Sequence, residues 1–232
     1  MSGHTDQFQT EVTRLLLEAV ENSGFVLAGA GAVRAHGLTN RPTEDIDLFA
    51  GSPISDEDFR TAVDTADSAL TQAGFEVSRL RDTGAFSRLR VYDPTGSRVL
   101  EVDFAVNWRA EPPVRMSLGL VLSERDAVAG KLSAVYSRGE VRDFLDLDSI
   151  RTSGRYSDAD LLALEAEHDI GFDQSMFAEQ LSRVILVDPV EAEEYDLDSE
   201  AFLQVQQRIM NWATALRDAE HDRPHDEDTR RT

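Results

Sequence analysis

Two aspartates two residues apart, Asp45 and Asp47, stand in the run EDIDLF. The alternation of acidic and apolar residues predicts a β-strand with both carboxylates on one face, while Ile46 and Leu48 point to the core. Two carboxylates on one strand repel each other, and a divalent cation removes that repulsion. Mg²⁺ typically takes one or two carboxylates together with substrate phosphates. We therefore predict a site for Mg²⁺, or for Mn²⁺, that serves chemistry on phosphate.

A third carboxylate is expected to complete such a site, and Asp103 is the candidate. It lies in the run LEVDFAV, where Val102 and Phe104 predict that its side chain points away from the apolar face. Glu101 shares that face, and the alternation does not separate the two acids. Aspartate is uncommon in strands, which favours a functional role for Asp103 over that of an ordinary exposed strand acid.

Lys131 is the only lysine among 23 basic residues. In a chain this rich in arginine, we expect lysine to remain where a compact ammonium is needed. Lysine acts on phosphate as a point charge, whereas the planar fork of arginine needs more room. This predicts that Lys131 binds a phosphate group. The competing hypothesis is a chance lysine on a solvated helix face.

The elements that must position these residues follow from periodicity. We expect a helix at 6–22, a strand at 25–28, a turn at 29–31 and a short helix at 32–36, then the acidic strand at 45–50. Ser55 should cap a helix that runs to 72, and strands should follow at 75–80, 85–92 and 99–106. This order predicts an α+β fold, with a mixed sheet covered by helices.

Beyond Pro112 and Pro113 the pattern changes. A short strand at 118–122 and a helix capped by Ser123 should lead into a mostly helical region that reaches 216, with a solvated acidic connector at 191–200. We expect three parts: a catalytic domain at 1–118, a helical domain at 119–220 that completes the active site, and a disordered tail at 221–232.

The 232-residue chain is acidic, with a net charge of −21 and no cysteine. The first ten residues do not resemble a signal peptide, and no apolar run approaches the roughly 20 residues that span a bilayer. We therefore expect a cytoplasmic protein without a membrane partner. The charge argues against a general nucleic-acid coat, and no DNA partner is expected. A local arginine cluster is either a solvated sheet edge or a phosphate-binding track; its members are Arg79, Arg81, Arg88, Arg90, Arg98, Arg109 and Arg115.

The stretch from Gly29 to Phe49, GAGAVRAHGLTNRPTEDIDLF, resembles the active-site motif of polymerase β-type nucleotidyltransferases, and in detail that of their AbiEii/AbiGii toxin branch. The matching residues are Gly29, His36, Gly37, Arg41, Thr43, Asp45, Asp47 and Leu48. Ala30 departs from the motif, which usually has Gly or Ser there. Without a hydroxyl, only backbone N–H groups of this turn could bind phosphate.

A second segment, KLSAVYSRGEVRDFLDL, resembles the C-terminal signature of the same branch. The matching residues are Lys131, Arg138, Arg142, Asp143, Asp146 and Leu147. The resemblance implies that the lysine and one of the two aspartates are needed for activity. The pattern leaves open which aspartate that is, and we expect the other one to pair with Arg138 or Arg142 and clamp two helices.

The resemblance implies transfer of a nucleoside monophosphate from an NTP to an acceptor hydroxyl. Asp45 and Asp47 would hold the metal, and Asp103 would be the general base or a ligand of a second metal. Gly29, Ala30, Arg41, Thr43 and Lys131 would bind the nucleotide. Thr43 has two further possible roles, a bond to the backbone at the strand entry or regulation by phosphorylation.

The resemblance also implies a biological role. Proteins of this branch, including the MenT group, are toxins of toxin–antitoxin systems, and several add pyrimidine nucleotides to the 3′ end of tRNA. We therefore expect CTP or UTP as substrate, the tRNA acceptor end as target and a cognate antitoxin as partner. Two other classes stay open: an enzyme that modifies a small cationic molecule, as aminoglycoside nucleotidyltransferases do, and a non-catalytic interaction protein.

Overall fold

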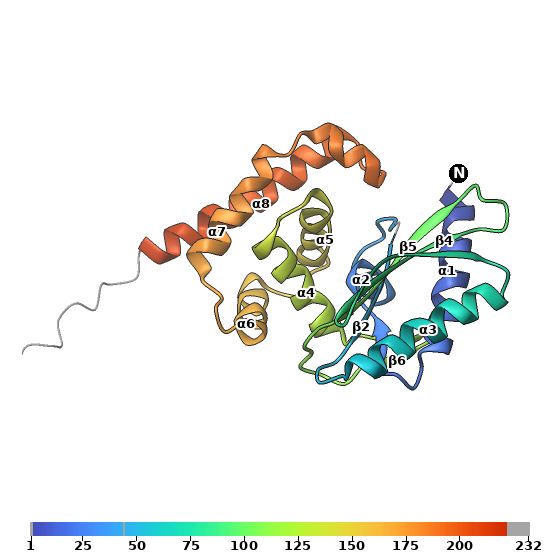
Figure 1. The fold of residues 1–232 in the computed structure, drawn as a ribbon. Helices are drawn as coiled ribbons and strands as arrows, with labels where there is room; N and C mark the ends of the chain where they lie inside the picture. Colours follow the sequence, from blue (N-terminus) through green and yellow to red (C-terminus); the bar gives the residue numbers. More distant parts are fainter. Residues whose placement is uncertain (1, 44, 222–232) are drawn as a thin grey trace, which may run out of the picture. The chain divides into compact units, whose positions relative to one another are not determined.

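A computed structural model describes residues 2–43 and 45–221 of the chain (Figure 1). The chain divides into two compact units, residues 1–131 and 132–232. The functional boundary after residue 118 stays a prediction. The tail predicted to be disordered lies outside the described residues, except that His221 ends the last helix. In the described ranges, no helix has the length and apolar character needed to cross a membrane.

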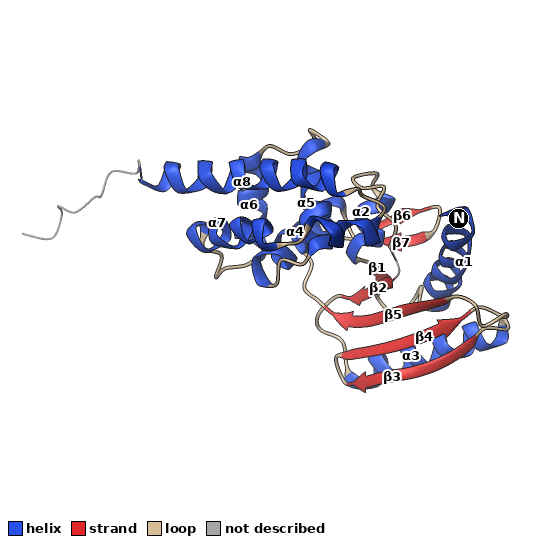
Figure 2. Cartoon of the chain, turned by 90° about the horizontal axis from the view of Figure 1, so that it is seen from above, coloured by secondary structure: helices blue, strands red, loops and turns tan. Residues whose placement is uncertain are grey.

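The first unit is built on a mixed sheet of seven strands in the order β3-β4-β5-β2-β1-β7-β6 (Figure 2). β2 runs parallel to β5 and β1 runs parallel to β7, whereas the other neighbours are antiparallel. The strands are β1 (Phe25–Leu27), β2 (Asp45–Ala50), β3 (Glu76–Thr83), β4 (Phe86–Tyr92), β5 (Val99–Val106), β6 (Val114–Met116) and β7 (Gly119–Val121). This sheet, with its helices, confirms the predicted α+β fold class.

Two helices, α1 (Ser2–Ala19) and α3 (Asp56–Gln72), pack against each other and cover one face of the sheet. The ring of Phe25 in β1 lies 5.5 Å from that of Phe59 in α3 and 5.3 Å from that of Phe104 in β5. Leu48 is the register partner of Phe104, so it faces the same buried layer. Burial of these aromatic and aliphatic side chains fixes which face of β2 is apolar.

The structure refines two local predictions. The predicted turn at 29–31 is the first turn of helix α2 (Gly29–Ala35), so the expectation of a separate turn was wrong. The short strand β6 was missed because two prolines precede it and its three residues give no readable alternation. Both predicted serine caps are confirmed: Ser55 accepts a hydrogen bond from the Asp58 N–H, and Ser123 accepts one from the Asp126 N–H.

The second unit is helical. Helix α4 (Glu124–Ser137) begins in the first unit and ends in the second. Four α-helices and two 3-10 segments follow it: α5 (Val141–Thr152), α6 (Asp158–His168), α7 (Gln174–Ser182), η1 (Arg183–Leu186), η2 (Pro189–Tyr195) and α8 (Ser199–His221). Phe177 of α7 packs edge-on against Trp212 of α8, with ring centroids 5.4 Å apart. The guanidinium of Arg151 lies over the same indole at 4.3 Å.

Candidate active site

The acidic face of the sheet is formed where β2 and β5 lie side by side. Asp45 and Asp47 are half-buried, whereas Ile46, Leu48 and Ala50 are buried, so the predicted alternation along β2 is confirmed. The parallel register pairs Asp45 with Glu101 and Asp47 with Asp103. Because register partners on neighbouring strands share a face, four carboxylates gather on the side of the sheet opposite to the Phe104 layer.

Gly29 stands directly against this acidic pair. A Cβ built on Gly29 would overlap the Asp47 carboxylate and lie 2.6 Å from its Cγ, and the backbone φ of Gly29 is +53°. The neighbouring Ala28 N–H donates to the Asp47 carbonyl at 2.8 Å. The first turn of α2 therefore reaches Asp47 only because residue 29 has no side chain. Ala30 is buried and its side chain has no polar atom, so only its backbone could bind a ligand.

Arg88 and Arg90 of β4 neutralise the two acids of β5. Arg88 Nε and Nη2 donate to the two Asp103 oxygens, each at 2.6 Å, and its Nη1 lies 2.9 Å from Glu101 Oε2. Arg90 Nη2 lies 2.6 Å from Glu101 Oε1. The hydrogen bonds with Asp103 raise the pKa of Arg88 well above its usual range. Such bidentate pairs fix geometry as well as charge, so Asp103 is held in one orientation.

The remaining arginines of the cluster behave mostly as a paired surface. Arg79 contacts Asp64 and Asp67 of α3 at 2.8 and 3.2 Å. Arg98 pairs with Asp93 in the turn before β5, and Arg115 pairs with Glu21. These contacts favour the solvated, ion-paired interpretation for these positions over a phosphate-binding track. Arg109 differs from them, because it donates to the backbone carbonyl of Gly24.

The chemistry of the donor set on β2 suits a hard divalent cation, since Asp45 and Asp47 offer carboxylate oxygens from one face. Within residues 2–43 and 45–221, however, no three Asp, Glu, His or Cys side chains are arranged to hold a metal. Asp103 is turned to Arg88 instead. The pair therefore fits a metal whose other ligands come from substrate phosphates, and the role of Asp103 as a metal ligand stays a prediction.

Thr43 and Arg41 lie at the entry to β2. Thr43 is buried, and its hydroxyl accepts a hydrogen bond from Gln9 Nε2 at 2.7 Å. The same amide donates to the Asp45 carbonyl at 3.0 Å, so Gln9 of α1 fixes the start of the acidic strand. Arg41 Nη1 donates to the Pro42 carbonyl. Sequence reasoning missed Gln9, although a polar residue on the apolar face of its helix was a usable signal.

Lys131 and His36 are both held inside the first unit. The Lys131 residue is only 6% exposed on α4, which excludes a solvated helix face. Asp126 anchors the start of that helix by accepting hydrogen bonds from the N–H groups of Ala110 and Glu111 at 2.7 and 3.1 Å. His36 Nε2 lies 2.8 Å from the Leu122 carbonyl, so this histidine ties α2 to the entry of α4.

In the second unit, the two candidate aspartates of α5 are both fully buried. Asp143 accepts hydrogen bonds from Arg138 Nε and Nη2 at 2.8 and 3.0 Å, and it accepts from the Glu140 N–H as part of a capping box. Asp143 thus takes the clamping role expected for one of the pair. Asp148, which sequence reasoning missed, forms a bidentate pair with Arg208 of α8 at 2.8 and 2.6 Å.

Comparisons with known proteins agree with this architecture. A search of curated proteins found no match. The crystal structure of JHP933 from Helicobacter pylori is similar with a TM-score of 0.51 at 18% identity, covering 95% of this chain and 97% of that one. A second H. pylori structure, described as that of a nucleotidyltransferase, gives a TM-score of 0.52 at 18% identity, covering 95% of this chain and 100% of that one. At such identity these two likenesses show the fold.

The family is shown by a sequence model. The model of the nucleotidyl transferase AbiEii toxin of type IV toxin–antitoxin systems matches residues 13–228, which include the acidic face, Lys131 and all of α5. This span confirms the family suggested by the two motifs. The chain therefore belongs to the AbiEii nucleotidyltransferase toxin family, and it is a nucleotidyl-transferring enzyme.

Proposed function

We propose that this enzyme is a toxin that transfers a nucleoside monophosphate from an NTP to the 3′ end of tRNA and thereby blocks translation. The register that sets Asp47 beside Asp103, with Asp45 on the same face, is the observation that supports it most directly. The proposed NTP is a pyrimidine nucleotide, CTP or UTP. The proposed setting is the cytoplasm, and the family adds a cognate antitoxin as partner.

In this proposal, Asp45 and Asp47 hold Mg²⁺ or Mn²⁺. When bound, the ion would neutralise negative charge on the triphosphate and on the leaving pyrophosphate. Asp103 accepts the proton of the attacking hydroxyl, in the orientation that its two bonds to Arg88 give it. Lys131, a largely buried residue of α4, provides an ammonium for a phosphate of the nucleotide.

Nucleotide binding is proposed for Gly29, Ala30, Arg41 and Thr43. The Gly29 backbone reaches the Asp47 carboxylate closely, which supports its place beside the reacting phosphates. Ala30 would act through its backbone N–H. Thr43 is proposed either to bind phosphate or to accept a regulatory phosphate. Its oxygen accepts from Gln9, which leaves the O–H free to donate, but the residue is buried, so both roles require that it become accessible.

The functional acid of α5 is proposed to be Asp146. Asp143 is committed to Arg138 and to the start of its helix, as the contacts above describe. Asp146 is equally buried and lies one helical turn further along. We propose that residues 1–118 form the catalytic domain and that residues 119–220 complete its site through Lys131 and Asp146.

Incubation of the purified protein with each labelled NTP and total tRNA tests the proposal. Label on tRNA with CTP or UTP, lost in Asp45→Ala, is the expected result. Asp64→Ala is the control, because Asp64 is an exposed acid on α3 that pairs with the surface residue Arg79. Label on protein or on a small molecule, with none on RNA for any NTP, would overturn the tRNA acceptor.

One observation favours a second candidate, an enzyme that modifies a small cationic molecule. The net charge of −21 attracts cations and repels RNA. A growth experiment separates the two functions. Growth arrest that is relieved by Asp45→Ala supports the toxin, whereas harmless expression that raises tolerance to an aminoglycoside supports the alternative.

A further inference from the structure

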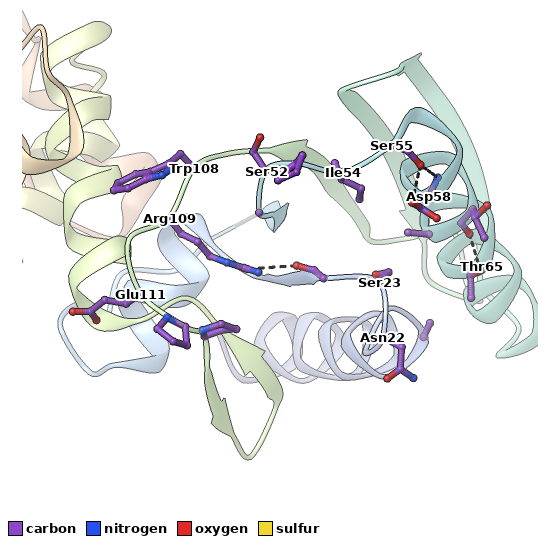
Figure 3. Close-up of a pocket in the computed structure, with 18 of the residues that line it drawn as sticks. Asn22, Ser23, Ser52, Ile54, Ser55, Asp58, Thr65, Trp108, Arg109 and Glu111 are labelled. Carbon is purple, nitrogen blue, oxygen red and sulfur yellow. Dashed lines mark hydrogen bonds between the residues drawn. The ribbon is translucent and has the colours of Figure 1, made fainter.

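A cavity of about 990 Å³ opens in the first unit at the ends of β2 and β5 (Figure 3). It is lined by the segments 22–24, 51–55 and 108–113 and by the first half of α3. The proposed metal ligands lie at the start of β2, and the cavity begins only after β2 ends at Ala50. Gly51 lies four residue steps along the chain from Asp47, which is about 13 Å. The cavity is therefore distinct from the acidic face.

Arg109 reaches into this cavity from the loop after β5. Its Nη1 donates to the carbonyl of Gly24, another lining residue, at 3.4 Å (dashed line at Arg109 in Figure 3). The other side of the guanidinium rests on Gly51, where an added Cβ would lie 3.1 Å from Nε and from Nη2. The glycine thus leaves the space that the guanidinium fills. Arg109 is therefore bonded to the backbone at Gly24 and lies close to the backbone at Gly51.

The charge of Arg109 is not cancelled locally. No carboxylate of the described chain lies within ion-pair distance of its guanidinium, in contrast to Arg79, Arg88 and Arg98. The two acids that line the cavity are engaged elsewhere. Asp58 accepts a hydrogen bond from the Ser55 hydroxyl at 2.7 Å, and Glu111, which points away from Arg109 in Figure 3, pairs with Arg125 at 3.2 Å.

This arrangement matters because the chain carries a net charge of −21. Such a protein repels a polyanion. The polyanion therefore gains most binding energy from cations that no carboxylate of the protein already neutralises. An arginine anchored by a neutral carbonyl is not neutralised by that contact, and most of its N–H donors remain available to a ligand. Its planar fork matches a phosphate oxygen pair. The adjacent Trp108 is 49% exposed, and its indole offers a stacking surface beside that site.

We infer that Arg109 and its cavity bind a phosphate of the RNA backbone. This contact would bind the acceptor RNA at a point distant from its reacting 3′ end. The inference rests on the proposed RNA acceptor. Trp108 and Arg109 project to opposite sides of their loop (Figure 3), so a base stacked on the indole belongs to a neighbouring nucleotide. The triphosphate of a free nucleotide offers the same phosphate oxygens to Arg109, and the experiment below distinguishes RNA from a free nucleotide.

The test measures binding of a fluorescent RNA that carries the acceptor end of tRNA, by anisotropy, with EDTA present so that no transfer occurs. We expect Arg109→Gln to weaken binding about tenfold at low salt, because a charge-assisted hydrogen bond is lost. The slope of log K against log salt should fall in magnitude by about 0.7, the value for one phosphate contact on a single strand. Arg109→Lys should keep the slope.

Two further variants make the result specific. Arg14→Gln, at an exposed position on α1 outside the cavity lining, changes the net charge equally and should leave the slope unchanged. Gly51→Ala changes no charge, yet it should weaken RNA binding because the new methyl group displaces the guanidinium. Circular dichroism confirms that each variant is folded.

The outcomes are distinguishable. If the wild type binds RNA and Arg109→Gln binds it with the same affinity and salt slope, the inference fails and the proposed function stands. If Arg109→Gln instead loses binding of CTP measured with Mg²⁺ by calorimetry while RNA binding is unchanged, the cavity serves the nucleotide and the inference is overturned. If the wild type binds no RNA at any salt concentration, the proposed acceptor fails together with the inference.

Discussion

Arg88 and Asp103 face each other across β4 and β5 and are joined by two hydrogen bonds of 2.6 Å each. The register of the antiparallel pair makes them direct neighbours, and Asp103 is in turn the neighbour of Asp47. The third acid of the site is therefore oriented from one side by an arginine and bordered on the other by a proposed metal ligand.

Arg88→Lys should lower kcat by about one to two orders of magnitude, because lysine keeps the charge but cannot make the bidentate contact that orients Asp103. The measurement is the steady-state rate of nucleotidyl transfer. Arg90→Lys is the matched control, because Arg90 contacts Glu101 and not Asp103, and it should cost less than fivefold. Equal losses in the two variants would contradict an orienting role for Arg88.

Gly29→Ala should abolish activity, because the added methyl group collides with the Asp47 carboxylate and the φ of +53° strains any L residue. The free energy of unfolding should fall by about 1–3 kcal/mol, measured by urea denaturation. Gly96→Ala is the control. Gly96 also has a positive φ, of +69°, but a Cβ there meets nothing within 4 Å. That variant should lose stability only and remain active.

Asp143→Asn and Asp146→Asn should separate stability from activity. Asp143→Asn breaks an ion pair with Arg138 and a helix cap, so it should lower the free energy of unfolding by about 1–3 kcal/mol. Asp146→Asn should reduce transfer by at least about a hundredfold, whereas Asp143→Asn should keep most of the activity of the protein that remains folded. Thermal denaturation and the transfer assay give the two readouts. Full activity of Asp146→Asn would return the functional role to Asp143.

Glu165 should make stability depend on pH. Burial raises its pKa to about 7, although the hydrogen bond donated by Ser133 opposes that shift and Asp169 adds to it. The folded protein then keeps the proton up to about pH 7, whereas the unfolded chain releases it near 4.3. The stabilising contribution is complete below the unfolded pKa and is lost as the pH rises through about 7.

Glu165→Gln therefore should gain stability relative to the wild type between pH 4.5 and pH 7.5, by on the order of 2–3 kcal/mol. Chemical denaturation at a series of pH values measures the difference. Glu179→Gln is the control, because it removes a carboxylate from an exposed position on α7. A difference between Glu165→Gln and the wild type that stays constant over this pH range would refute the raised pKa.

The sequence predicted the acidic strand well because its signal is local. A strand with one buried face must alternate, so Ile46 and Leu48 determine where Asp45 and Asp47 point before any partner strand is known. The serine caps were predictable for the same reason, since Ser55 and Ser123 act within three residues of themselves. The two family motifs added the reaction class, which local periodicity does not contain.

Only the tertiary structure decided which charged residues meet. Arg88 and Asp103 are 15 residues apart, Asp148 and Arg208 are 60 apart, and Arg109 reaches Gly24 across 85 residues. Such pairs depend on strand register and helix packing, which place distant segments side by side and leave no periodic trace in either segment. The sequence by itself determined the face on which the acids lie. The fold determined that Asp103 is held by Arg88, and that Arg109 is anchored by a backbone carbonyl.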